Sequence, residues 1–207
     1  MKRLVVVIAL VVTSAVYGQQ QFGTFIGEVV AKWDTNGRTM TLMEPFAYID
    51  PDGRRWNAPK GAQIDGASIP RIAWSIIGGP FEGQYRAASV IHDVACVERQ
   101  QDWRKVHRAF FTGMRAGGVA QTQAKIMFAA VYHFGPRWAV REVKTVCNPG
   151  SSCHPETVMI QSLSYSLVEA QFEELAGIIR KRDQQTPGSV QIAPLSVEDI
   201  EAYVPLR

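Results

Sequence analysis

The sequence has little excess of charge of either sign. It carries 22 Lys and Arg residues against 19 Asp and Glu residues, a formal net charge of +3. If a segment ending at Gly18 is removed, Lys2 and Arg3 go with it, and 20 basic residues remain against 19 acidic ones, a net charge of +1. A near-neutral chain offers no electrostatic footprint for a nucleic acid, so nucleic-acid binding is not expected.

Cysteine is also scarce, with three in 207 residues. Cys147 and Cys153 enclose the segment NPGSS, a spacing that could close a small disulfide ring in an exported protein. The alternative is a pair of reduced thiols in a mobile loop. Cys96 lies in an apolar segment and is expected to be a buried thiol.

One long aliphatic run, residues 4–12, follows the basic residues Lys2 and Arg3 and precedes small residues that end at Gly18. This layout is typical of a secretory signal, and the run is too short for a comfortable membrane span. No cysteine follows it, which argues against a bacterial lipid anchor. We predict a signal peptide over residues 1–18 and an exported protein, periplasmic or extracellular; an uncleaved anchor is the alternative.

The rest of the chain is long and apolar enough to bury a sizeable core, with 46% hydrophobic residues. Residues 22–57 carry the β-branched and aromatic residues of half-buried strands, as in TMTLM and FAYID. The turns DTNGR and DPDGR place Gly37 and Gly53 where a positive φ is needed. Residues 59–81 are rich in Gly and Pro and are expected to be irregular, with a short helix at 71–77.

Helical periodicity dominates after residue 84. Asp102 is the expected N-cap of the second helix, Gly117 with Gly118 its end, and Ser196 the cap of the last helix. In chain order the predicted helices cover residues 84–99, 102–117, 122–134, 162–182 and 196–203, and the third is expected to resume over 137–146 after Gly135 and Pro136.

These elements predict an α+β fold. A small N-terminal antiparallel β layer is expected to pack on a mainly helical core that contains an antiparallel helix pair. Residues 19–146 would form a single domain with the functional site, and residues 147–207 a C-terminal helical extension.

Two stretches carry the chemistry: DGASIP, which begins at Asp65, and IHDVAC, which ends at Cys96. On a helix, His92 and Cys96 share one face, while Asp93 points about 100 degrees away. Antiparallel pairing with the next helix would place His107 near His92. His92 could then take a proton from water, with its tautomer fixed by His107 and a cation held by Asp93. Equally, His92, His107 and Asp65 would make a zinc site with two imidazoles and one carboxylate.

Structural roles must be set beside these chemical ones. A buried His in a helix often satisfies only a carbonyl, and Asp65 can accept from amides within its own turn. Ser68 lacks the glycine-flanked elbow of a hydrolase nucleophile, and Gly78 with Gly79 is too sparse for a phosphate loop. His133 and His154 are expected to be structural or exposed. Trp74, Trp103 and Trp138 are expected to be core residues, and the alternative for Trp74, beside an open turn, is that it lines a ligand cleft.

The stretch DGASIPRIAWSIIGGPFEGQYRAASVIHD is followed by FFTGMRAGGV and then by KIMFAAVYHFGPRW. This set, in this order, resembles the bacterial and phage family known as domain of unknown function 1353, over residues 46–138. The resemblance implies no settled activity. The second helix of that family carries an acidic residue where this chain has Lys105 to His107, so His107 or Asp102 would take the place of that residue.

A second resemblance is to bacterial secreted phospholipase A2 enzymes, in an acidic Gly-containing turn, an HD helix and a facing helix. It implies that His92 is a general base, that Asp93 is a calcium-binding carboxylate and that Asp65 is a further ligand from the turn. The match is confined to these few residues.

We therefore predict an exported, cation-dependent hydrolase with a His base, calcium as its ion and phospholipid ester as the first substrate. The alternatives are a zinc-dependent cell-wall hydrolase and a non-enzymatic binding or assembly protein of phage or envelope origin. Its partners would be a lipid or another envelope component. An enzyme requires an accessible His92, whereas in a structural role His92 and Asp65 would be fully buried and bonded.

Overall fold

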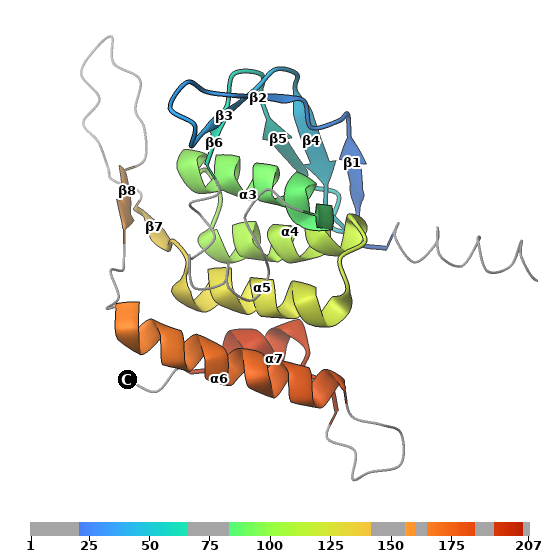
Figure 1. Cartoon of the computed structure of the whole chain (residues 1–207), viewed down its shortest axis with the longest axis vertical. Coiled ribbons are helices and arrows are strands. Elements are labelled where there is room, and N and C mark those ends of the chain that lie inside the picture. The colour runs from blue at the N-terminus through green and yellow to red at the C-terminus, as the bar shows by residue number, and fades with distance from the viewer. Residues whose placement is uncertain (1–20, 66–82, 142–155, 160–164, 185–192, 205–207) are drawn as a thin grey trace, which may run out of the picture.

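The structure is a computed structural model that describes residues 21–65, 83–141, 156–159, 165–184 and 193–204. Its elements lie in successive layers: a β layer, then helices α3, α4 and α5, then α6 with α7 (Figure 1). The predicted α+β class is confirmed. The predicted signal segment, the disulfide and the helix at 71–77 lie outside the described residues.

The β layer consists of two three-stranded antiparallel sheets. The predicted turns are confirmed, because Gly37 and Gly53 have φ values of 64° and 79°. The first sheet contains β1 (Thr24–Ile26), β4 (Phe46–Ile49) and β5 (Arg55–Ala58), and the second contains β2 (Ala31–Trp33), β3 (Met40–Leu42) and β6 (Gln63–Ile64).

Strand β6 corrects the expectation that residues 59–81 are irregular from their start. Ile64 pairs with Met40 and is only 1% exposed. The sequence around it is rich in Gly and Pro, so no alternating pattern marked a strand of two residues. Its burial depends on pairing with β3 and on packing against α3.

Three consecutive helices follow the 3-10 turn η1 (Gly83–Tyr85): α3 (Arg86–Glu98), α4 (Trp103–Ala116) and α5 (Gln121–Phe134). Asp102 caps α4 as predicted, since its side chain accepts from the backbone N–H of Arg104. Helix α4 packs against both α3 and α5. Gly113 allows close approach of α3, because a Cβ there would lie 3.2 Å from Cβ of Ala88.

The expectation that a helix resumes over residues 137–146 is wrong for its first part. Residues Trp138–Arg141 form strand β7, which pairs antiparallel with β8 (Glu156–Met159). Gly135 leaves the helical conformation, and the guanidinium of Arg137 donates to the carbonyls of Tyr132 and His133. These bonds satisfy the last carbonyls of α5 and stabilise its end.

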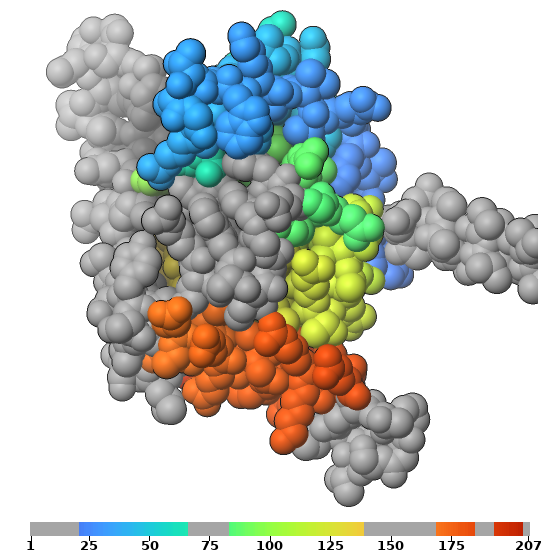
Figure 2. Space-filling view, viewed as in Figure 1, coloured from blue at the N-terminus to red at the C-terminus, as the bar shows by residue number. Residues whose placement is uncertain are grey.

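The C-terminal helices cover α5. Helix α6 (Tyr165–Asp183) and helix α7 (Val197–Ala202) both contact it, and α7 begins with the predicted cap Ser196 in a reciprocal pair with Asp199. Phe172 and Ile200 belong to the same hydrophobic core as α3 to α5. The β layer, the helices and α6 form successive bands on one face of the molecule (Figure 2). Within the described residues, no helix combines the length and apolarity needed to cross a membrane.

Candidate functional site

The imidazoles of His92 and His107 meet at the interface between α3 and α4. Nε2 of His92 lies 2.8 Å from Nδ1 of His107. The two residues are 1% and 0% exposed. The predicted juxtaposition of these rings by an antiparallel helix pair is therefore confirmed, and the pair is closed to solvent.

The hydrogen bonds fix which nitrogens carry protons. Nε2 of His107 lies 3.1 Å from the carbonyl oxygen of Pro136, which can only accept, so this nitrogen is the donor. In a neutral ring Nδ1 of His107 is then an acceptor, and Nε2–H of His92 donates to it. Nδ1 of His92 is left as the unprotonated nitrogen of the pair.

Both imidazoles are held in the neutral form. Burial lowers the pKa of His92 from 6.5 to about 3. Burial also lowers the pKa of His107 well below 6.5, with a further lowering from His92, while the bond to Pro136 opposes the shift. The cause is the removal of a charged ring from water. A base with so low a pKa takes a proton poorly at neutral pH.

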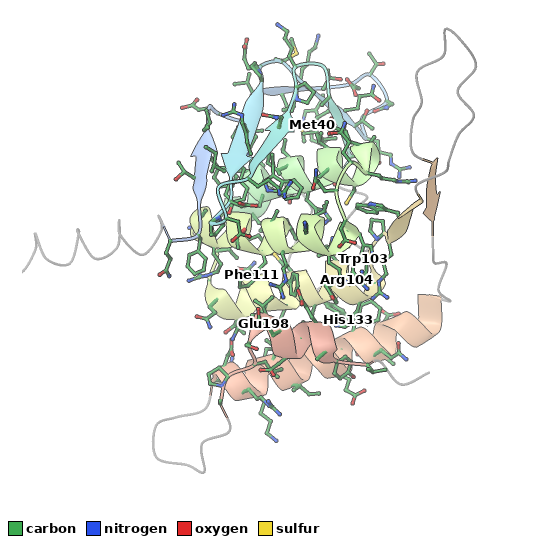
Figure 3. The ribbon with its side chains drawn as sticks, turned by 180° about the vertical axis from the view of Figure 1, so that it is seen from behind. Met40, Trp103, Arg104, Phe111, His133 and Glu198 are labelled. Atoms are coloured by element: carbon green, nitrogen blue, oxygen red, sulfur yellow. The ribbon has the colours of Figure 1, made fainter. Side chains whose placement is uncertain are left out.

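Aromatic rings enclose this pair. The ring of His92 lies 4.7 Å from that of Phe110, and the ring of His107 lies 5.6 Å from that of Trp103. Trp103 and Arg104 mark the start of α4 (Figure 3). Trp103 and Trp138 are 5% and 2% exposed, so both are core residues as expected. The surroundings of the two imidazoles are thus apolar.

Cys96 is the third polar group beside the imidazoles. It is a thiol, 5% exposed, and lies one helical turn after His92. Its Sγ is 3.6 Å from Nε2 and 3.9 Å from Nδ1 of His92. One ligand atom each from His92, Cys96 and His107 lies within 4.8 Å of the others, close enough to hold one metal ion.

The site predicted from the sequence does not include Cys96, which is expected only to be a buried thiol. Cys96 follows His92 by four residues, and on a helix this spacing indicates that the two side chains lie on one face and could share a site.

Asp93 and Asp65 are placed differently from the imidazoles. Asp93 is 2% exposed, on another face of α3 from His92, and one turn after Ser89. The Oγ of Ser89 is buried and has no hydrogen-bond partner within the described part of the chain. Asp65 is half-buried and directly follows β6, which packs on α3. The residues Gly66 to Pro70 lie outside the described ranges, so cation binding by Asp65 and Asp93 stays a prediction.

His133 is not part of this cluster. It is 4% exposed, and its Nε2 donates to the carbonyl oxygen of Ile200 at 2.6 Å, which joins α5 to α7 (Figure 3). The expectation of a structural role for His133 agrees with this contact.

A polar cavity of about 100 Å³ lies between β5 and the end of α3. Its lining combines apolar residues, such as Trp56 and Ile91, with guanidinium, amide and carboxylate groups. Arg54 donates to Oε1 of Gln101 at 2.9 Å, and Arg55 donates to Oδ1 of Asn57 at 2.8 Å, so these polar groups are held in place. The remaining lining residues are Ala95, Glu98 and Gln100.

Comparison with known proteins gives a family and two relatives. The family described as "Protein of unknown function (DUF1353)" matches residues 40–131, a range that includes His92, Cys96 and His107. Two proteins of Sinorhizobium fredii (strain NBRC 101917 / NGR234), both described as uncharacterised, are similar to the chain. The protein y4jT is 45% identical over 134 residues, which are 62% of this chain and 40% of the relative. The protein y4iH is 32% identical over 157 residues, which are 76% of this chain and 61% of the relative.

The chain therefore spans less than two thirds of the length of either relative. No solved structure matches it.

Proposed function

We propose that this chain, which carries a domain of the DUF1353 family over residues 40–131, is a non-enzymatic binding protein of the cell envelope. The observation that carries the proposal is the seclusion of the His92–His107 pair. A general base must reach water and substrate, whereas these imidazoles are 1% and 0% exposed, neutral and bonded to each other. Such a pair ties two helices together.

The cavity between β5 and α3 is the proposed binding site. Its lining is mainly polar, with guanidinium, amide and carboxylate groups beside Trp56 and Ile91, and polar groups that converge on one cavity can fix the orientation of a small ligand. Arg54 and Arg55 favour a carboxylate, because guanidinium groups bind carboxylates through two parallel hydrogen bonds. Asn57, Gln100 and Gln101 add amides suited to hydroxyl groups. A cell-wall component with carboxylate and hydroxyl groups has this chemistry.

Binding of the full chain to isolated cell-wall sacculi tests the proposal. Arg54→Gln with Arg55→Gln is expected to weaken binding by about tenfold or more, since charge-assisted hydrogen bonds are lost. Arg38→Gln removes the same type of charge from an exposed turn outside the cavity lining, and should leave binding unchanged. Absence of binding, or equal binding by the cavity and control variants, would reject the proposal.

The second candidate is the cation-dependent hydrolase, and the bond between His92 and His107 favours it. The bond leaves Nδ1 of His92 as the unprotonated nitrogen and places His107 as its orienting partner, as a general base requires. Asp93 with Asp65 would hold calcium in a phospholipase-like reaction. Zinc would serve in hydrolysis of a cell-wall bond.

Turnover assays decide between these candidates. Phospholipid vesicles with calcium, and cell-wall sacculi with zinc, are the two substrates. A hydrolase should lose turnover in His92→Gln while it stays folded, and calcium-dependent thermal stability should disappear in Asp93→Asn or Asp65→Asn. If the unmodified chain cleaves neither substrate, the hydrolase candidate is rejected. The binding proposal is then decided by the sacculus-binding experiment alone.

A further inference from the structure

We infer that α3 and α4 form a transition-metal site whose ligands are Nε2 of His92, Sγ of Cys96 and Nδ1 of His107. This ligand set differs from the predicted one, in which Asp65 is the third ligand. It goes beyond the proposed binding function and does not depend on it, because the metal cluster and the cavity occupy different faces of α3.

The distances between the ligand atoms agree with a single zinc ion. Zinc bonds of about 2.05 Å to nitrogen and 2.3 Å to sulfur, at tetrahedral angles, separate S and N by about 3.6 Å and two N atoms by about 3.3 Å. The observed separation between Cys96 Sγ and His92 Nε2 is 3.6 Å. Nε2 of His92 and Nδ1 of His107 are 2.8 Å apart, so the imidazoles need to separate by about 0.5 Å when the ion replaces their hydrogen bond.

The second nitrogen of His107 already has the partner that a metal-bound imidazole requires. A ligating His usually donates its other ring N–H to a carboxylate or a backbone carbonyl, which fixes the ring and raises its basicity. Nε2–H of His107 donates to the carbonyl of Pro136. The turn after α5 thus orients this ring with Nδ1 directed at the other ligands.

The donors select the class of ion. Thiolate and imidazole ligands suit zinc and copper(I), whereas calcium and magnesium take oxygen ligands. On binding, the thiol proton of Cys96 leaves to solvent, and the proton on Nε2 of His92 moves to Nδ1, so that both ligand atoms present lone pairs. The complex carries one positive charge with zinc and none with copper(I).

Rigid placement supports the same inference. His92 and Cys96 project from one face of α3 at a spacing of one turn, and both are buried. His107 is fixed on α4 by its contact with Pro136 and by the neighbouring ring of Trp103. Ligands on helices held by packing and second contacts need little reorganisation to bind an ion.

Metal content and cobalt spectroscopy of the full chain, purified without a polyhistidine tag, test the inference. After equilibration with zinc and dialysis, we expect about one zinc per chain and a rise in melting temperature, because the ion binds the folded state. Cobalt(II) should produce an absorption band of thiolate-to-metal charge transfer. Cys96→Ser should abolish that band, and His92→Gln and His107→Gln should weaken zinc binding by about 100-fold or more.

Two controls match these variants in chemistry. His133→Gln removes a buried His that lies outside the cluster, and the double variant Cys147→Ser with Cys153→Ser removes the other two cysteines. Both should retain zinc and the cobalt band. The inference is overturned if the folded wild type binds no zinc and no copper(I), if calcium alone raises its melting temperature, or if Cys96→Ser keeps the charge-transfer band.

The cobalt spectrum of the double variant Cys147→Ser with Cys153→Ser decides the matter even if a cluster variant fails to fold, since a thiolate band requires a cysteine ligand and Cys96 is the one cysteine that this variant keeps. Competition between zinc and copper(I), each buffered by a chelator, identifies the ion. Retention of either metal by the three cluster residues supports the site.

Discussion

Nε2 of His92 and Nδ1 of His107 lie 2.8 Å apart, and this bond joins α3 to α4 inside the core. In metal-free protein, His107→Leu removes the acceptor of His92 and the donor to Pro136. Because buried polar groups then lack partners, we expect the free energy of unfolding to fall by about 1–3 kcal/mol. Urea denaturation of both proteins in the presence of a chelator measures this change in the free energy of unfolding.

A double-mutant cycle separates the bond from the loss of packing. His92→Leu alone should cost a similar amount, and the double variant should cost less than the sum by more than about 0.5 kcal/mol, because its second substitution removes a group already left without a partner. Strict additivity would show that the two imidazoles do not stabilise each other.

Close packing between α3 and α4 makes Gly113 sensitive to a single added methyl group. A Cβ there would meet Cβ of Ala88 at 3.2 Å, whereas a Cβ at Gly177 on α6 would meet no atom within 4 Å. Gly113→Ala gains helix propensity but displaces α3, and we expect a net loss of about 1–2 kcal/mol. Gly177→Ala should instead stabilise by about 0.5–1 kcal/mol. Equal shifts in melting temperature in the two variants would contradict the inference that close packing against α3 leaves no room for a Cβ at Gly113.

The buried ion pair of Lys125 and Asp183 holds α6 on α5. Nζ lies 2.8 Å from Oδ1, and the side chains are 4% and 6% exposed. Thr122 also donates to this carboxylate. Lys125→Met leaves a buried carboxylate without its cation, so we expect a loss of about 3–5 kcal/mol in the free energy of unfolding.

Two further variants test that explanation. Lys125→Met combined with Asp183→Leu should recover much of the loss, because no buried charge remains. Arg104→Met breaks a pair with Asp102 whose side chains are 57% and 47% exposed, and should change stability by less than about 1 kcal/mol. If Lys125→Met is as mild as Arg104→Met, the pair does not hold the C-terminal helix.

Local patterns were enough to predict the helical part of the site. The N-cap at Asp102 and the apolar repeats on both helices fixed an antiparallel pair, and the pair brought His107 to His92. The contact of Cys96 with the ring of His92, and its closeness to His107, depend on side-chain rotation within that interface. Residue spacing indicated only that Cys96 shares a face with His92.

The errors concern pairings between distant segments. Trp138 to Arg141 pair with residues 156–159, and Ile64 pairs with Met40. Neither short strand shows a period of its own, so tertiary contacts decide its conformation. The contact between His133 and the carbonyl of Ile200, 67 residues later, is likewise invisible to a periodic pattern.

That contact of His133 predicts a dependence of stability on pH. Burial lowers the pKa of His133 below 6.5, and Arg137 lowers it further, while the bond to Ile200 and the carboxylate of Glu201 oppose the shift. Tyr203 and Tyr132 also pack on the ring. Below pH 6.5 the unfolded chain therefore binds a proton that the folded chain does not, and stability falls as the pH falls.

His133→Gln isolates this contribution, because an amide can still donate to the carbonyl of Ile200 but does not titrate. Each such group contributes a slope of at most about 1.4 kcal/mol per pH unit. The lowered pKa values of His92 and His107 add to the wild-type slope, so the variant should keep part of it. Urea denaturation of metal-free protein from about pH 7 to pH 5 measures both slopes. Equal slopes in the wild type and in His133→Gln would mean that His133 has the same pKa in the folded and unfolded chains. Its burial against α7 would then make no contribution to the dependence of stability on pH.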